Sequence, residues 1–161
     1  MTQERFVELV KEEQEVLRSF LLALCCGERP LAEDLAQETL LKAWLASARY
    51  EERYRFRTWL CKIAYRTYID HLRRHAHTPL PLDETTPLPA SEQSDDIFRH
   101  ESLHRALARL PIKERTAVCL FYLEEQSIRE IAIATGCSQL AVKQQLKRGR
   151  EHLRNMLKNE R

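Results

Sequence analysis

Residues 127–154 read SIREIAIATGCSQLAVKQQLKRGREHLR, and this stretch decides which fold the chain is expected to adopt. Ser127 and Glu130 have the spacing of a capping box, in which each side chain satisfies a backbone N–H at a helix start. Apolar residues then recur at helical spacing up to Gly136, the residue best able to take the left-handed conformation that ends a helix. Ser138 is a second cap candidate, and the apolar stripe behind it predicts a longer second helix through Val142, Leu146, Leu153 and Met156.

The second predicted helix carries basic and amide side chains away from its apolar stripe. Such side chains can bind phosphates and hydrogen-bond base edges in a major groove, as in a helix-turn-helix. A solvated amphipathic hairpin is the alternative, because motif matches are fallible. The candidate duplex-contacting residues are Ser138, Gln139, Lys143, Gln144, Lys147 and Arg148.

Composition points to an all-α protein. The 161 residues suffice for one ordinary domain or two small ones, and a hydrophobic fraction of 43% favours a folded chain. Only three glycines are present, and helical periodicity recurs without sustained alternation.

The net charge of +2 hides two basic zones that lie far apart in the sequence. Residues 138–161 hold seven Lys or Arg against two Glu, and residues 42–75 hold nine against three acids. Residues 77–98 between them contain five acids and no Lys or Arg, so this segment should avoid DNA.

The N-terminus lacks the apolar core of a signal peptide, and the longest apolar run, residues 20–26, is too short to span a bilayer. We therefore expect a cytoplasmic protein without membrane insertion. The five cysteines lack CxxC spacing and are interpreted mostly as small core residues. The adjacent Cys25 and Cys26 leave a redox switch as an alternative.

Neither a metal site nor catalysis is expected. His71, His75 and His77 could form part of a metal site, but no carboxylate or cysteine follows nearby to complete it. The sequence shows no phosphate-binding glycine loop, no HExxH and no activated nucleophile, so we predict neither a cofactor nor an enzyme.

The N-terminal half is predicted to begin with two helices. Residues 2–26 read as one amphipathic helix ending near Gly27, and Pro30 suits the first turn of the next, with Glu33 and Asp34 at its positive end. Its expected inward face is Leu35, Ala36, Thr39, Leu40, Ala43 and Trp44. Its opposite face presents Asp34, Gln37, Glu38 and Lys42, for which solvation is the default interpretation.

Residues 49–58, RYEERYRFRT, interleave arginine with aromatic side chains ahead of a third helix that runs to about His75. Arginines can hold phosphates while aromatic rings stack on unpaired bases. Five apolar residues here are assigned to the core: Phe56, Trp59, Leu60, Ile63 and Ala64. The candidate nucleic-acid face comprises Tyr50, Tyr54, Arg55, Lys62, Tyr65, Arg66, Arg73 and Arg74.

The chain is therefore divided into residues 1–75, a proline-rich acidic linker at 76–97, and residues 98–161, which resume helical spacing. The C-terminal part reads as four helices with a break at Pro111. Each part is near the size at which folding alone is marginal, so the two could also fold together.

Three segments in this order resemble bacterial sigma factors of the extracytoplasmic-function group. The segment DLAQETLLKAW at 34–44 is similar to the family's second conserved region. The segments FRTWL at 56–60 and IDHLRR at 69–74 are similar to its DNA-melting helix, and Leu110 onward to its fourth region.

The resemblance implies a function for each candidate surface. Asp34, Gln37, Glu38 and Lys42 would dock on the clamp of the largest RNA polymerase subunit, in place of simple solvation. Residues 49–74 would capture the −10 element as a single strand. The helix-turn-helix would read the −35 element as duplex. The implied partners are core RNA polymerase, through its clamp and flap, promoter DNA and an anti-sigma factor.

Two departures from the family pattern and two rival functions stay open. Glu52, Arg53 and Tyr54 replace the usual small residues before Phe56, which bears on −10 specificity. Gly149 lies inside the last helix, where a close helix or DNA approach would explain it. The rivals are a helix-turn-helix regulator that acts without core polymerase, and an adaptor that binds only proteins.

Overall fold

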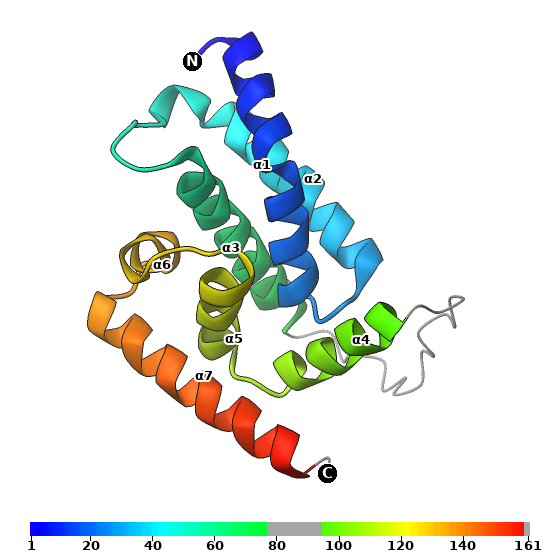
Figure 1. Ribbon diagram of the computed structural model, residues 1–161. Helices are drawn as coiled ribbons and strands as arrows, with labels where there is room; N and C mark the ends of the chain where they lie inside the picture. The colour runs from blue at the N-terminus through cyan, green and yellow to red at the C-terminus, as the bar shows by residue number, and fades with distance from the viewer. Residues whose placement is uncertain (77–94, 160–161) are drawn as a thin grey trace.

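The structure, a computed structural model, describes residues 1–76 and 95–159, with side chains omitted for residues 95–100. All regular structure within these ranges is helical (Figure 1). The predicted linker at 76–97 lies mostly outside the described residues. The elements are α1 (Gln3–Leu24), α2 (Arg29–Leu45), η1 (Ser47–Arg49), α3 (Phe56–His75), α4 (Asp95–Ala108), α5 (Ile112–Val118), η2 (Cys119–Leu123), α6 (Ile128–Thr135) and α7 (Gln139–Asn159).

Helices α1, α2 and α3 pack on one another and form the N-terminal half. Thr2 caps α1 by accepting a hydrogen bond from the Arg5 backbone N–H at 3.2 Å. The helix ends slightly earlier than predicted, because Cys26 and Gly27 both have positive φ angles, 55° and 88°. This left-handed pair turns the chain into α2.

Two expectations for α2 were wrong. The helix begins at Arg29, so its first turn contains no acidic residue, and Glu33 and Asp34 fall in the second turn. Trp44 was assigned to the buried face but remains 39% exposed. Its ring covers the edge of the core instead, with its centroid 5.1 Å from that of Phe6.

The C-terminal half contains the helix-turn-helix as predicted. Both hydrogen bonds of the capping box between Ser127 and Glu130 are present, and Gly136 ends α6 in the left-handed region with φ 72°. The Ser138 hydroxyl accepts from the Ala141 backbone N–H at 3.1 Å and so begins α7. The helix predicted after Pro111 continues as the π-helical turn η2.

Gly149 marks the close approach of α5 to α7. A Cβ atom built on Gly149 would lie 2.7 Å from Cγ2 of Val118, closer than real Cβ contacts come. Of the two explanations that the sequence left open, close helix packing is therefore the one realised here.

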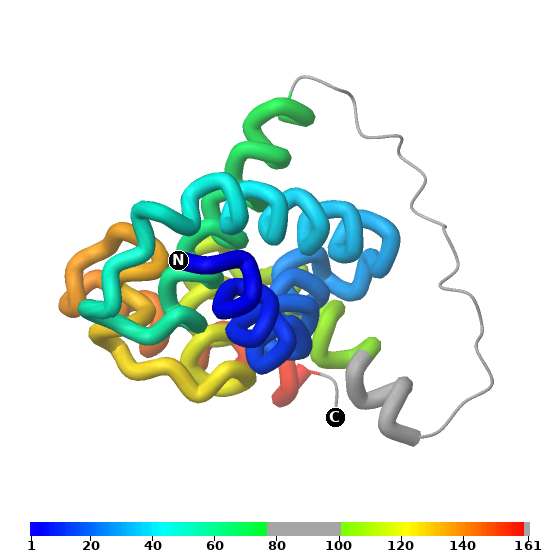
Figure 2. The backbone as a smooth tube through the Cα atoms, turned by 90° about the horizontal axis from the view of Figure 1, so that it is seen from above, coloured from blue at the N-terminus to red at the C-terminus, as the bar shows by residue number. Residues whose placement is uncertain are grey.

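The two halves share one hydrophobic core. Buried side chains of α1 and α3 form a single cluster with those of α5, η2 and α6. Viewed from above, α6, the first helix of the helix-turn-helix, lies beside α3 (Figure 2). The halves thus fold together in this structure, which fits the small size of each.

A buried arginine lies at the centre of this junction. Arg115 is 8% exposed and donates to the main-chain oxygens of Leu107, Ala108 and Leu110 in its own half, at 2.9, 3.4 and 3.1 Å. It also reaches the Leu24 carbonyl at the end of α1 and the Tyr68 hydroxyl on α3, at 3.1 and 3.0 Å. Helix C-termini carry partial negative charge, so they stabilise this cation without a carboxylate.

Candidate nucleic-acid and polymerase interfaces

The predicted duplex-contacting residues lie together on the exposed face of α7. Lys143, Gln144, Lys147 and Arg148 are all exposed, and the last three line a shallow hollow with Glu151. Gln139, beside the cap residue Ser138, is exposed as well. The face therefore offers cations and an amide without rearrangement, the combination that contacts phosphates and base edges.

Leu140 belongs to the same exposed turn, and sequence reasoning missed it. Its side chain is 66% exposed next to Gln139 and one turn before Lys143 and Gln144. An apolar side chain in this position could contact a thymine methyl group. Its place outside the apolar stripe of α7 was the available signal.

Tyr50 and Tyr54, from the candidate single-strand face, are held by packing. The Tyr50 ring lies 5.5 Å from Phe56 and 5.2 Å from Trp59 between centroids, and its hydroxyl donates to the Tyr54 carbonyl at 3.1 Å. Burial raises the pKa of the Tyr50 phenol. Tyr54 is half-buried, so both rings shape the loop before α3 in this state.

The remaining candidates follow α3 from one end to the other. Arg66, Arg73 and Arg74 are exposed, whereas Lys62 and Tyr65 are half-buried. Burial raises the pKa of the Tyr65 phenol, and the nearby thiol of Cys137, in the turn between α6 and α7, raises it further. The middle of the face is thus turned toward the helix-turn-helix.

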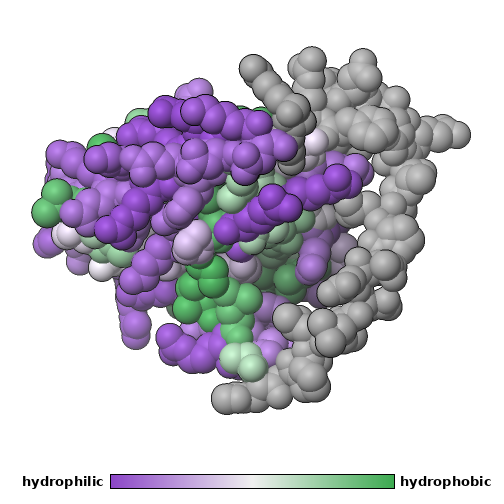
Figure 3. All heavy atoms as spheres, turned by 90° about the horizontal axis from the view of Figure 1, so that it is seen from below, coloured by the Kyte–Doolittle hydropathy of each residue, from purple (hydrophilic) through white to green (hydrophobic). Residues whose placement is uncertain are grey.

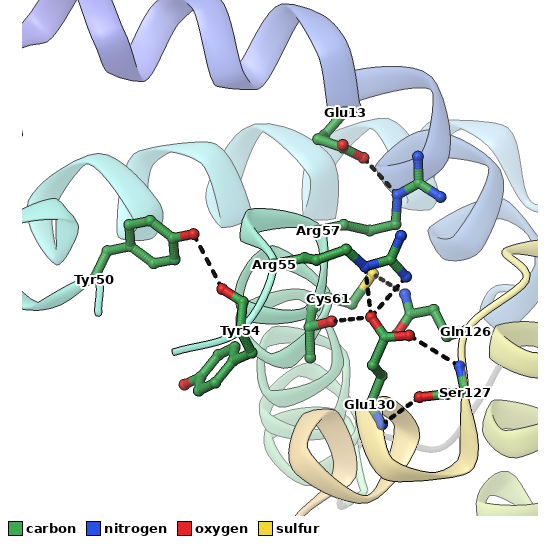
Figure 4. Close-up of polar contacts among 10 residues, drawn as sticks. Glu13, Tyr50, Tyr54, Arg55, Arg57, Cys61, Gln126, Ser127 and Glu130 are labelled. Atoms are coloured by element: carbon green, nitrogen blue, oxygen red, sulfur yellow. Dashed lines mark hydrogen bonds and ion pairs between the residues drawn. The ribbon is translucent and has the colours of Figure 1, made fainter. Parts of the chain in front are cut away.

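At the start of α3, Arg55 is paired rather than free. Its Nε donates to Oε2 of Glu130 at 2.6 Å (Figure 4). Thr58 Oγ1 donates to the same oxygen at 3.0 Å. Nearby, Arg57 Nε donates to Glu13 on α1 at 2.7 Å. Sequence reasoning assigned Glu130 only to the helix cap and missed this contact, because residues 75 apart carry no local signal.

The predicted polymerase-binding residues share one side of α2. Asp34 and Gln37 are exposed, while Glu38 pairs with Lys42 at 3.1 Å and with Arg74 at 3.4 Å. Partial burial opposes ionisation of Glu38, but these two cations outweigh it and lower the pKa of the carboxyl.

Two apolar side chains extend this side of α2. Leu41 and Leu45 are 59% and 75% exposed and follow Asp34, Gln37 and Glu38 at helical spacing. Exposed leucines beside charged groups are typical of a surface that a protein partner covers. The three- and four-residue spacing was the signal that could have added them to the set.

The histidines and cysteines give no sign of a further site in the residues that the structure describes. The rings of His71 and His75 stack at 4.1 Å, and His77 lies outside the described residues. No group of three potential metal ligands occurs among the described positions. Burial raises the pKa of the Cys25, Cys61 and Cys119 thiols to about 12, as expected for cysteines in the core.

No described helix has the length and apolarity needed to cross a membrane.

Each half of the chain matches the model of a known protein family. The model for Sigma-70 region 2 covers residues 9–78, and that for Sigma-70 region 4 covers residues 100–153. The chain is 36% identical to the RNA polymerase sigma factor CarQ of Myxococcus xanthus, over 96% of this chain and 90% of that protein. It belongs to the extracytoplasmic-function sigma factors of RNA polymerase.

Further relatives agree with this assignment. The sigma factor is 33% identical to the ECF RNA polymerase sigma factor SigF of Caulobacter vibrioides, over 82% of this chain and 74% of that one. It is 29% identical to the probable RNA polymerase sigma factor RfaY of Xanthomonas campestris, of whose length it spans 41%.

A solved structure has the same fold throughout. It is the sigma factor RpoE of Bartonella quintana in complex with the anti-sigma factor NepR, with a TM-score of 0.81 and 26% identity. The similarity covers 98% of this chain and 99% of that one. The expectation of an all-α sigma factor is confirmed.

Proposed function

We propose that this sigma factor recruits core RNA polymerase to promoters through three separate surfaces: one side of α2, the face of α3 and the exposed face of α7. The observation that carries this division is their placement. Each predicted residue set is centred on a different helix, although Tyr50, Tyr54 and Arg55 precede α3. One chain can therefore contact protein, duplex and single strand at different points. The chain acts by binding, without chemistry of its own, in the cytoplasm where the polymerase works.

The side of α2 that carries Asp34 and Gln37 is proposed to dock on the clamp of the largest polymerase subunit. The salt bridges from Lys42 and Arg74 to Glu38 hold the carboxylate in one position. Leu41 and Leu45 add apolar area, which supplies affinity when it is removed from water.

The exposed face of α7 is proposed to read the −35 element as duplex. Lys147 and Arg148 line a shallow hollow together with Gln144, so phosphate and base contacts can form side by side. An arginine can bind guanine through two parallel hydrogen bonds, whereas lysine acts as a point charge on phosphate.

The face of α3 is proposed to capture the −10 element as a single strand. Arg66 and Arg73 are exposed and can hold the backbone in the folded state shown here. Tyr65 is half-buried beside Cys137 of the other half, so full use of this face requires the halves to move apart.

Two protein partners beyond the clamp are proposed, the polymerase flap and an anti-sigma factor. The face seen from below is mostly hydrophilic, with a hydrophobic area near its centre that a protein partner could cover (Figure 3). The anti-sigma proposal draws support from the solved relative, whose structure contains such a protein.

The test is reconstitution with core RNA polymerase. Purified chain and core enzyme are mixed and run-off transcription is measured across a promoter library, with core enzyme alone as the control. We expect transcripts from a defined subset of promoters that share −35 and −10 sequences. DNA binding without core-dependent transcripts would instead indicate a regulator that acts alone, and neither activity would indicate an adaptor.

A further inference from the structure

The two oxygens of the Glu130 carboxylate serve different helices. Oε1 accepts from the Ser127 backbone N–H at 3.1 Å and closes the capping box of α6. Oε2 faces α3, where it accepts from Arg55 Nε at 2.6 Å and from the Thr58 hydroxyl at 3.0 Å, and also lies 2.6 Å from the second Arg55 nitrogen, Nη2. Figure 4 shows this carboxylate between the two elements.

The contact between Glu130 and Arg55 is strengthened by charge and by the partial burial of Glu130. The Glu130 side chain is only 19% exposed, which disfavours its charged form, but the cap and the α3 donors together lower the pKa of the carboxyl. Short bonds between charged groups are about twice as strong as neutral ones. The Arg55 side chain is 54% exposed, so salt and competing anions can still reach it.

The residues around Glu130 close the same junction. Gln126 Nε2 donates to the Cys61 thiol at 3.3 Å, and Cys61 is 1% exposed on the turn of α3 that follows Thr58. The α6–α7 turn lies near Tyr65, one further turn along. The segment from Gln126 to Cys137 therefore covers the N-terminal part of the α3 face that we assign to the promoter strand, up to Tyr65.

We propose that Glu130 substitutes internally for a promoter phosphate: it occupies Arg55 and thereby holds α6 over the strand-capturing face of α3. A phosphate that binds Arg55 removes the charged partner of Glu130 and so weakens the contact of α6 with α3. The contact in the folded chain rests on its own geometry, whereas its exchange for DNA rests on the proposed function.

The capping bond is separate from this exchange, and that makes the proposal testable. Because Oε1 serves α6 and Oε2 serves α3, Glu130→Gln removes the charge while keeping an acceptor at the third position of α6, where glutamine also supports a capping box. The control is Glu125→Gln, which alters the net charge equally at an exposed position in the same half. Circular dichroism checks that both variants keep their helices.

The first readout is the rate at which N-ethylmaleimide alkylates Cys61 in the free full-length chain at one pH, followed by peptide mass spectrometry. We expect Glu130→Gln to alkylate about three- to tenfold faster than wild type, because a charged hydrogen bond is lost. Glu125→Gln should match wild type. Thr58→Val, which removes one donor without touching the cap, should give a smaller increase, about twofold.

The second readout is binding of the free chain to fluorescent oligodeoxythymidine at low salt, where Glu130→Gln should bind more tightly than Glu125→Gln. Equal alkylation rates for Glu130→Gln and wild type would overturn the contact, and faster alkylation with unchanged oligonucleotide affinity would overturn the phosphate exchange. Failure of the proposed function is seen separately, as missing promoter transcripts with core polymerase, whatever the alkylation rates are.

Discussion

The faces of α3 and α7 carry similar side chains but differ in what covers them. On α7, Lys147 and Arg148 stand exposed around a hollow. On α3, Arg55 is paired with Glu130, and Tyr65 is half-buried against the other half. Basic composition alone therefore does not tell whether a nucleic-acid face is available. In this fold the face of α7 that we propose to read duplex is exposed, while the face of α3 that we propose to capture a single strand is partly covered by the chain itself.

The largest expected effect concerns Arg115, which joins the two halves and so keeps the face of α3 partly covered. Arg115→Met would leave buried carbonyl groups and the Tyr68 hydroxyl without their donor, so we expect a loss of about 3–5 kcal/mol in the free energy of unfolding. Urea denaturation followed by circular dichroism measures it. Arg109→Met, an exposed change in the same half, should cost under about 0.5 kcal/mol. Similar midpoints for both variants would show that the halves do not depend on this arginine.

The second prediction concerns the exposed face of α7. Lys143→Ala and Arg148→Ala should each weaken binding of the polymerase holoenzyme to its promoter by about 1–3 kcal/mol, because each removes a phosphate or base contact. Filter binding measures the affinity, and co-purification with core should be unchanged. Lys158→Ala, near the end of α7, is the matched control. A parallel loss of core binding would contradict the assignment of α7 to DNA.

We expect the packing of the C-terminal half on α1 and α3 to be more stable at mildly acidic pH than at neutral pH. Glu124 is 5% exposed, inserted between Glu13 and Ser19 on α1 and Arg57 on α3, with one oxygen lacking a hydrogen-bond partner. Burial raises its pKa to about 7, and the repulsion of Glu13 adds to this, while Ser19 and Arg57 oppose it. Since the folded pKa exceeds the unfolded one, wild type loses stability as the pH rises from about 4.5 to about 7.

Glu124→Gln should remove this loss and be more stable than wild type by about 1–2 kcal/mol at pH 8, with little difference at pH 4.5. Urea denaturation of both proteins across this pH range measures the difference, which cancels the titration of other groups. A difference that does not change with pH would show that Glu124 keeps its charge inside the junction.

The smallest expected effect concerns the side of α2 that carries Asp34 and Gln37, which contacts the α3 face through the pair of Glu38 with Arg74. Asp34→Ala and Gln37→Ala should each weaken binding to core polymerase by about 1 kcal/mol, because they are exposed polar contacts at an interface. Co-purification with tagged core enzyme reports this, and thermal melts should be unaffected. Retention of both variants at the wild-type level would move the clamp contact away from this side of α2.

The local signals in the sequence predicted most of the fold. The capping box at Ser127 and the left-handed turn at Gly136 were both found at the expected positions, because each depends only on nearby backbone groups. Helix α3 ends at His75 as expected. The start of α2 was less well predicted, since Pro30 is compatible with more than one position in a first helical turn.

The sets of candidate residues were predictable, but their surroundings were not. Spacing on a helix tells which side chains share a face, so the residues of α7 and α2 were grouped correctly. Which face is covered depends on contacts between distant segments, such as Arg55 with Glu130 and Cys61 with Gln126. No periodicity in the chain records those pairings, and their roles in binding remain predictions.

Different nitrogens of the Arg115 guanidinium donate hydrogen bonds to different halves of the chain. Only the nitrogen Nη1 reaches Leu24 and Tyr68, whereas Nε and Nη2 are bound by main-chain oxygens of its own half. If the halves part, a single nitrogen meets water and the rest of the charge stays solvated by the protein. The junction can therefore open at this point without leaving an unsolvated cation on either side.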